Sequence, residues 1–453
     1  MTGFIAKIKN RISATDGRTS LIRKNVIASF AIKGWSVLVQ LALVPLTLAC
    51  LGVYENGVWL TVSSVLLWID NLDIGLGNGL RNKLAAAIAH NDNEEARRMV
   101  SSTLAMLVAI ILPTLIILLA VEMGCDNYAL FNVDKNTVGG LDTVIIASTI
   151  LVCGTFVLKF MGNFYMGLQL PAINNLLVTS GNTLALLGTF LIYISGTHSL
   201  LLIAIANTAA PFIVYLCCFP ITFGGKYRHL CPALRYVSMD AAKNLFSIGI
   251  RFFVLQISGV VLFFSSNIII SRLFSPSMVT PYQIAHRYFM VAMLFFTIIC
   301  VPYWSATTDA YERKDFDWIR RANRTLNRFM LLILLLITVM IVASPLVYHV
   351  WIGQKASVPF MMTVLVGIYE FVLIASTRYS FVLNGIGALN LQLVMTIIAA
   401  VVYIPLAFFA GKQTHDINWL LIVMCAVNVP GLVVNAIQYH KIINGTAEGI
   451  WKK

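Results

Sequence analysis

An apolar stretch that ends in a charged one decides the fold: residues 57–104 read GVWLTVSSVLLWIDNLDIGLGNGLRNKLAAAIAHNDNEEARRMVSSTL. Residues 57–76 are apolar over the ~20 residues that a helix needs to cross a bilayer. Residues 77–99 then carry four Lys/Arg, which the positive-inside rule assigns to the cytoplasmic side. We therefore predict a membrane-spanning helix that ends in a cytoplasmic segment.

The same alternation of apolar run and polar segment extends over all 453 residues. The chain is 59% hydrophobic and only 11% charged, whereas a soluble domain carries roughly 25% charged residues. This composition excludes a soluble globular protein and predicts an all-α integral membrane protein with about 12 transmembrane helices. The other predicted spans are 25–50, 100–121, 143–164, 174–195, 199–221, 245–272, 281–305, 326–350, 358–383, 391–411 and 419–438.

The distribution of basic residues sets the expected topology. With the N-terminus inside, 22 of the 32 Lys/Arg fall on inner segments and three on outer segments. We expect a multi-pass protein of the bacterial inner membrane with both termini in the cytoplasm. The net charge of +13 then reflects this topology and gives no reason to expect a nucleic-acid partner.

An internal repeat predicts two lobes. The segment NDNEEARRMVSSTL (91–104) aligns with RKDFDWIRRANRTL (313–326) at an offset of 222 residues, about half the chain. Two halves of six spans each would form pseudo-symmetric six-helix lobes around a central cavity, as in parallel-repeat transporters. The expected parts are a cytoplasmic amphipathic N-terminus (1–24), an N-lobe (25–221), a cytoplasmic inter-lobe linker (222–244), a C-lobe (245–438) and a cytoplasmic tail (439–453).

Basic and amide side chains within spans are the candidate substrate-binding residues of that cavity. Charges inside the bilayer are costly and therefore mark candidate function, although side chains near a helix end can instead snorkel to the surface. Lys33 and Arg251 occupy similar depths in the two halves. Each of them either faces the cavity or snorkels to the membrane surface, and the sequence leaves both alternatives open. The candidate set for binding an anionic head group is Lys33, Arg251, Arg287, Arg378, Gln40 and Gln256.

Glu370 lies near the middle of the predicted span 358–383. A carboxylate at this depth predicts either a carrier of the coupling ion, H⁺ or Na⁺, or the partner of a basic group across the cavity.

The segment after residue 69 is a candidate inner gate. Asp70 and Asp73 are three residues apart and are expected on one helix face. The glycines that follow, including Gly77, are expected to break the helix. No strand precedes them and no GK[ST] follows, so a P-loop is excluded. The predicted gate residues are Asp70, Asp73, Gly77, Asn78 and Arg81.

No sequence feature predicts catalysis, a metal site or a cofactor. The eight cysteines contain no CxxC pair, and the seven histidines form no HExxH motif. A polytopic glycosyltransferase or polysaccharide polymerase, the alternative from another class, would need a metal-binding carboxylate motif or a sizeable outer domain. The DFD at 315–317 lies in a predicted inner loop instead. We therefore expect a transporter rather than an enzyme.

Residues 57–104 resemble the bacterial polysaccharide (O-antigen and repeat-unit) flippases of the multidrug/oligosaccharidyl-lipid/polysaccharide exporter superfamily. The resemblance is clearest over DIGLGNGLRNKLA (73–85) and NDNEEARR (91–98). It implies ion-coupled flipping of an undecaprenyl-diphosphate-linked oligosaccharide to the outer leaflet by alternating access. Membrane lipid and proteins of polysaccharide assembly would be its other partners. A multidrug/cation antiporter of the same superfamily is the alternative, and it would favour acidic rather than basic cavity residues.

Overall fold

The computed structural model describes residues 17–70, 76–238 and 265–452. Most of these residues lie in long helices, and there is no strand among them. The long helices of the N-terminal half are α2 (Gly17–Asp70), α4 (Asn93–Gly124), α6 (Leu141–Leu158), α8 (Pro171–Ile194) and α9 (Leu200–Gly224). Shorter helices are α3 (Leu76–Ala89), α5 (Asn127–Phe131) and α7 (Phe160–Gly167). The C-terminal half contains α11 (Pro276–Glu312), α12 (Phe316–Trp351), α13 (Phe360–Ile386), α14 (Asn390–Thr414) and α15 (Ile417–Ile443).

The prediction of about 12 spans is confirmed. Nine helices among the described residues are long and apolar enough to cross a membrane. One of them, α2, covers two predicted spans, and α11 covers the predicted span 281–305. Of the predicted span 245–272, only the helical residues from 265 onward are described.

A kink at Gly52 divides α2 into two arms. Gly52 has a φ of 68°, in the left-handed region that glycine adopts without steric cost. The arm before the kink already begins at Gly17, so residues 17–24 continue the first span instead of forming a separate surface helix. The other residues of the expected N-terminal surface helix, 1–16, lie outside the described residues.

The internal repeat is present with a corrected offset. Asn91 and Lys314 both have positive φ, 57° and 58°, and each is followed by an aspartate that caps the next helix. The two caps, Asp92 and Asp315, are 223 residues apart, one more than the sequence alignment at 222. The turn geometry sets the structural alignment of the two halves. An alignment from residue identities alone is displaced from it by one residue.

Two arginines make equivalent contacts in this corrected register. Arg97 donates to the backbone oxygen of Cys231 at 2.7 Å, and Arg320 donates to that of Ile443 at 3.1 Å. Both acceptors lie at or just beyond the last long helix of their half. Each half is thus tied in the same way, from the start of its third spanning helix to the end of its sixth.

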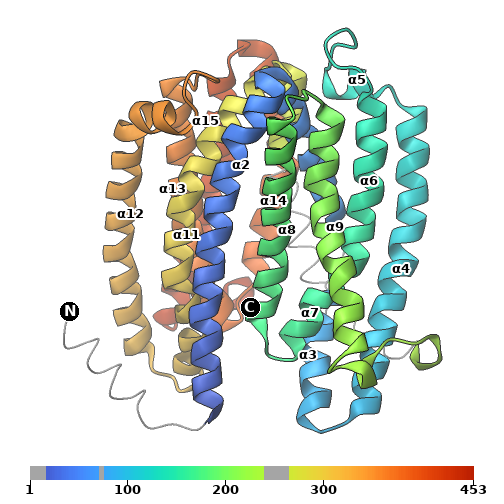
Figure 1. The fold of residues 1–453 in the computed structure, drawn as a ribbon. Coiled ribbons are helices and arrows are strands. Elements are labelled where there is room, and N and C mark those ends of the chain that lie inside the picture. Colours follow the sequence, from blue (N-terminus) through green and yellow to red (C-terminus); the bar gives the residue numbers. More distant parts are fainter. Residues whose placement is uncertain (1–16, 71–75, 239–264, 453) are drawn as a thin grey trace.

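Each half has its own apolar core. One cluster of buried side chains runs from Cys50 to Leu230, and a second runs from Ile269 to Ile443. Figure 1 shows α11, α12, α13 and α15 grouped on one side and α4, α6 and α9 on the other. A third, smaller cluster packs Val44 and Leu48 of α2 against Ile284, Tyr348 and Ile352 of the C-terminal half. The main cores are therefore separate, and the two halves share only this small apolar contact among the buried clusters.

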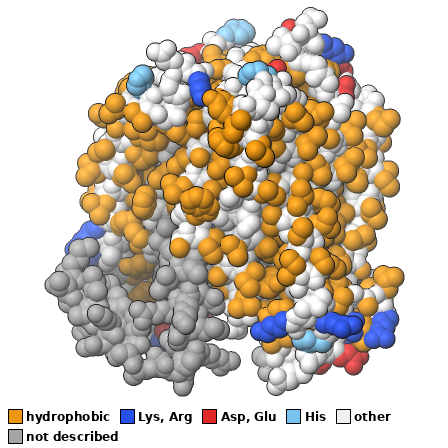
Figure 2. All heavy atoms as spheres, in the orientation of Figure 1, with side chains coloured by type: hydrophobic (Ala, Val, Ile, Leu, Met, Phe, Trp, Pro, Cys, Tyr) orange, Lys and Arg blue, Asp and Glu red, His pale blue; other side chains and the backbone are white. Residues whose placement is uncertain are grey.

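The outer surface is apolar over most of its height. Large hydrophobic side chains are exposed on peripheral helices, such as Ile116 on α4 and Leu331 and Val342 on α12. Figure 2 shows this apolar surface over the visible face, with Lys and Arg gathered at its lower rim. Such a surface would be unstable in water, and it matches a bilayer flanked by its head groups.

The lobes are joined by hydrogen bonds near the end where α5 lies. The Thr280 hydroxyl donates to the Val53 oxygen at 2.7 Å and accepts from the Asn56 amide at 3.2 Å. The Ser271 hydroxyl donates to the Phe131 oxygen at 2.7 Å. This seam lies opposite the end at which α2 begins (Figure 1).

Gly57 allows the two lobes to approach at the seam. It lies on α2, and a Cβ at this position would overlap the backbone oxygen of Pro276 in the other lobe. Because the obstacle is backbone, no side-chain rotation can relieve it. An alanine at position 57 should therefore separate the lobes at this end.

We predict that Gly57→Ala opens the seam. Spin labels replacing Lys135 and Lys355, which are exposed on the two lobes at this end, would show longer distances in this variant by electron–electron double resonance. The matched control is Gly431→Ala in α15, where a Cβ would meet open space, and its distances should equal those of the parent. Unchanged distances in Gly57→Ala would contradict the seam geometry.

Candidate functional site

A cavity of about 740 Å³ lies between the two lobes. Helices α2, α6, α8 and α9 line it from the N-terminal half, and α11 and α13 line it from the other half. Its volume lies within the ~300–1,000 Å³ range of small-molecule sites.

Much of the cavity wall is polar although it is surrounded by apolar helices. Hydroxyl and amide side chains face the space from both lobes. They include Gln40, Ser63, Thr155, Asn182, Asn207, Gln283 and Thr377. Such groups offer hydrogen bonds to a polar ligand without fixing its charge.

Besides His286, three charged side chains line the cavity. Lys159 lies on the N-terminal side at the end of α6, Arg287 lies on α11, and Glu370 lies on α13. The Arg287 side chain is half-buried. Two basic groups therefore face the space from different lobes, against one carboxylate.

The carboxylate is already engaged by a neighbouring histidine. His286 Nδ1 lies 2.6 Å from Glu370 Oε1, and Glu370 is only 1% exposed. The distance is that of an ion pair, although the two atoms lack the alignment of a hydrogen bond. The Tyr282 ring stacks on the imidazole with centroids 6.1 Å apart. This packing holds the histidine against the acid.

A chain of amides fixes the wall beside this pair. The Gln283 amide donates to Asn267 Oδ1 at 2.7 Å, and the Asn267 amide donates to the Leu60 oxygen of the other lobe at 3.1 Å. Asn267 is 4% exposed. The network therefore connects the lobes through the cavity wall itself.

The structure brings together only part of the predicted substrate-binding and coupling residues. Gln40, Arg287 and Glu370 line the central cavity. Lys33 is exposed on α2, outside the residues that line it. Arg378 lines a separate hollow in the C-terminal half. Arg251 and Gln256 lie outside the described residues.

The expectation that glycines break the helix at the predicted gate is wrong for Gly77. This residue lies inside α3, and the helix continues through it to Ala89. The described part of α2 ends at Asp70 and α3 begins at Leu76, and residues 71–75 between them lie outside the described residues. Arg81 is exposed on α3. Asp73 and the side chains of Asp70 and Asn78 lie outside the description.

Sequence reasoning missed two charged or titratable lining residues. Lys159 is close enough to a helix end to suggest snorkelling, yet it lines the cavity at the junction of α6 and α7. His286 is not among the predicted site residues, and its contact with Glu370 spans 84 positions of the chain. Nothing in the local pattern identifies that contact. Within the described ranges, no group of three or more His, Cys, Asp or Glu could hold a metal ion.

Comparison with known proteins agrees with this architecture. No family model matches the chain. A curated relative from Salmonella typhimurium (strain LT2), named "Putative O-antigen transporter", is 18% identical over 380 residues, which cover 80% of this chain and 84% of the relative.

Solved transporter structures share the fold. An inward-facing multidrug resistance MATE family transporter of the MOP superfamily superposes with a TM-score of 0.78 at 17% identity, over 93% of this chain and 98% of that one. An outward-facing structure of a MATE family transporter gives 0.58 at 17% identity, over 92% and 96%. The chain is thus a multi-pass membrane protein with the fold of these MATE family structures.

Proposed function

We propose that the chain flips an undecaprenyl-diphosphate-linked oligosaccharide repeat unit from the cytoplasmic to the outer leaflet by alternating access. The observation that carries the proposal is Arg287, a guanidinium that faces a polar cavity between two lobes. The name of the Salmonella relative supports the same substrate class.

Arg287 suits a diphosphate for electrostatic reasons. A charge within the membrane is costly unless an opposite charge compensates it. Among the described residues, no carboxylate lies within ion-pair distance of Arg287, and the nearby Glu370 contacts His286 instead. The planar guanidinium donates two parallel hydrogen bonds to phosphate oxygens. Lys159 adds a second positive charge to the wall on the other lobe.

The rest of the wall suits sugar hydroxyls. The lining includes Asn182, Asn207, Ser63 and Thr377, and amides and hydroxyls pair with hydroxyls as donors or acceptors. The cavity could hold a head group, while the polyprenyl chain would stay in the surrounding bilayer.

The seam between the lobes determines the state of the cavity. It closes the end near α5, which the positive-inside rule assigns to the outside. The higher TM-score to the inward-facing transporter than to the outward-facing one supports this assignment. Transport would then require the Thr280 and Ser271 bonds to break and a new closure to form at the opposite end.

We further propose that Glu370 carries the coupling ion, H⁺ or Na⁺. A carboxylate that is 1% exposed and 2.6 Å from an imidazole can exchange a proton without either group leaving the cavity. Tyr282 lies beside the imidazole, and Arg287 and Lys159 are basic groups in the same cavity wall. Gain or loss of the proton changes the charge next to the phosphate site, which would couple the gradient to binding.

Cation export is the second candidate, because Glu370 is the type of residue that a cation site needs. The fold is also shared with structures named as multidrug transporters. Efflux of a cationic dye from the same proteoliposomes tests this alternative directly.

We predict that Arg287→Gln lowers flipping of a labelled polyprenyl-diphosphate oligosaccharide in proteoliposomes by roughly tenfold or more. The charge-assisted hydrogen bonds that it removes contribute about 1.5–3 kcal/mol, and ~1.4 kcal/mol corresponds to a factor of ten. Arg287→Lys should keep part of the rate. The control is Arg228→Gln, at an exposed arginine outside the cavity. A parental rate in Arg287→Gln would remove the basis of the proposal.

Glu370→Gln should uncouple transport from the ion gradient. The amide has nearly the same shape but does not carry the ion, so flipping should continue at a low rate that an imposed pH or Na⁺ gradient no longer changes. The measurement is the initial flipping rate with and without each gradient. If the variant keeps the parental acceleration, Glu370 is not the carrier.

A further inference from the structure

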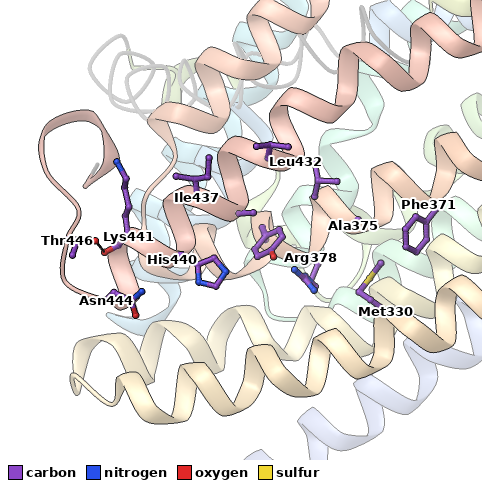
Figure 3. Close-up of a pocket in the computed structure, with 13 residues that line it drawn as sticks. Met330, Phe371, Ala375, Arg378, Leu432, Ile437, His440, Lys441, Asn444 and Thr446 are labelled. Atoms are coloured by element: carbon purple, nitrogen blue, oxygen red, sulfur yellow. Dashed lines mark hydrogen bonds between the residues drawn. The ribbon is translucent and has the colours of Figure 1, made fainter.

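A second hollow, of about 610 Å³, lies within the C-terminal half among α12, α13 and α15. Figure 3 shows its lining, from Thr446 and Lys441 at one end to Phe371 and Met330 at the other. The proposed transport cycle assigns no role to this space.

The hollow lies on the side of α13 that faces away from the central cavity. Glu370 and Thr377 of this helix line the cavity, whereas Phe371, Ala375 and Arg378 line the hollow. Within each set the residues are three, four or seven positions apart, so they share one face of the helix. At ~100° per residue, the two faces are about a quarter to a half turn apart. No residue of α15 lines the central cavity, but Val433 and Ile437 line the hollow.

The polar and apolar parts of the hollow are ordered along the helices. On α15, His440 lies three residues before the last helical residue, Ile443, and the apolar Ile437 and Val433 lie one and two turns deeper. On α13, Phe371 and Ala375 precede Arg378 in the same sense. A basic rim at the end of the helices thus leads into an apolar groove at membrane depth. Val433 and Ile437 are 48% and 40% exposed, so the groove is open along its side.

Arg378 is the charged group at the junction of these two parts. It is only 8% exposed, its Nη1 donates to Asn327, and its guanidinium lies 3.9 Å from the centre of the Tyr379 ring. Its Nε is buried without any hydrogen-bond partner. Neither Asn327 nor Tyr379 supplies a negative charge. A buried guanidinium with an unused donor is a ready site for an anionic oxygen.

The surroundings favour an anion as well. None of the residues that line the hollow is acidic, and His440 and Lys441 add basic groups. The start of α12, beside this rim, exposes further arginines. They are Arg321, Arg324 and Arg328. Clusters of Lys and Arg next to a membrane attract anionic lipids by about 1 kcal/mol per residue.

We propose that this hollow binds an anionic phospholipid, with the phosphate at Arg378 and His440 and an acyl chain along Ile437, Val433 and Phe371. The charge at the rim selects an anionic head group, and the open apolar groove at membrane depth accepts a hydrocarbon chain rather than a water-soluble anion. The site is separate from the transport path and faces the bilayer.

The test is native mass spectrometry of the full-length, delipidated protein titrated with dioleoyl-phosphatidylglycerol or dioleoyl-phosphatidylcholine. The parent should retain phosphatidylglycerol at least tenfold more tightly. Arg378→Gln should abolish this preference, and Arg378→Lys should restore part of it. The control is Lys226→Gln, at an exposed basic residue of the N-terminal half, which should behave as the parent.

Arg378 also contacts neighbouring side chains, so its substitution changes their packing as well as the charge. A second variant therefore leaves every charged residue in place. Ala436→Trp fills the groove and should reduce phosphatidylglycerol binding without any change at the rim. Parental binding in both variants would overturn the proposal. Displacement of the lipid by excess glycerol 3-phosphate would assign the site to free phosphate esters, and selective displacement by undecaprenyl phosphate would assign it to a carrier lipid. Either result would also overturn it.

Discussion

The contact between the two lobes at one end is the constraint on which the rest of the structure depends. Thr280 joins the second lobe to Val53 and Asn56 of the first, and Gly57 lets the backbones approach. Because each lobe has its own core, closing one end leaves a space between the bundles toward the other. That space is the central cavity. A seam of a few hydrogen bonds and one small apolar cluster can separate without unfolding either main core, which alternating access requires.

The chemistry of the cavity follows from how its charges are arranged. His286 contacts the carboxylate of Glu370, and among the described residues no carboxylate pairs with Arg287, which lines the same cavity. This arrangement is the basis for proposing an anionic head group beside Arg287 and a coupling ion at Glu370. The same helix, α13, carries Arg378 on its other face toward the bilayer. One helix therefore separates the proposed transport site from the proposed lipid site.

Hydropathy and basic-residue counts predicted the spans because the bilayer fixes helix length and composition directly. They also identified Glu370, since a mid-membrane carboxylate is rare. They could not identify its contact with His286, because that pairing depends on how α11 packs on α13. Arg378 was assigned to the cavity because depth along a helix can be read from sequence, whereas the direction a side chain faces depends on neighbouring helices. The helical state of Gly77 likewise depends on packing, which overrides glycine's low helix propensity.

Sided thiol accessibility tests the central claim most directly, namely that the cavity is sealed by the seam and open at the opposite end. Thr377→Cys lies in the cavity wall, and Lys355→Cys is exposed at the sealed end. In a background without native cysteines, a membrane-impermeant thiol reagent should label position 377 in inside-out vesicles but not in intact spheroplasts. Position 355 should show the opposite pattern. Labelling of position 377 only from outside, or from neither side, would contradict the account.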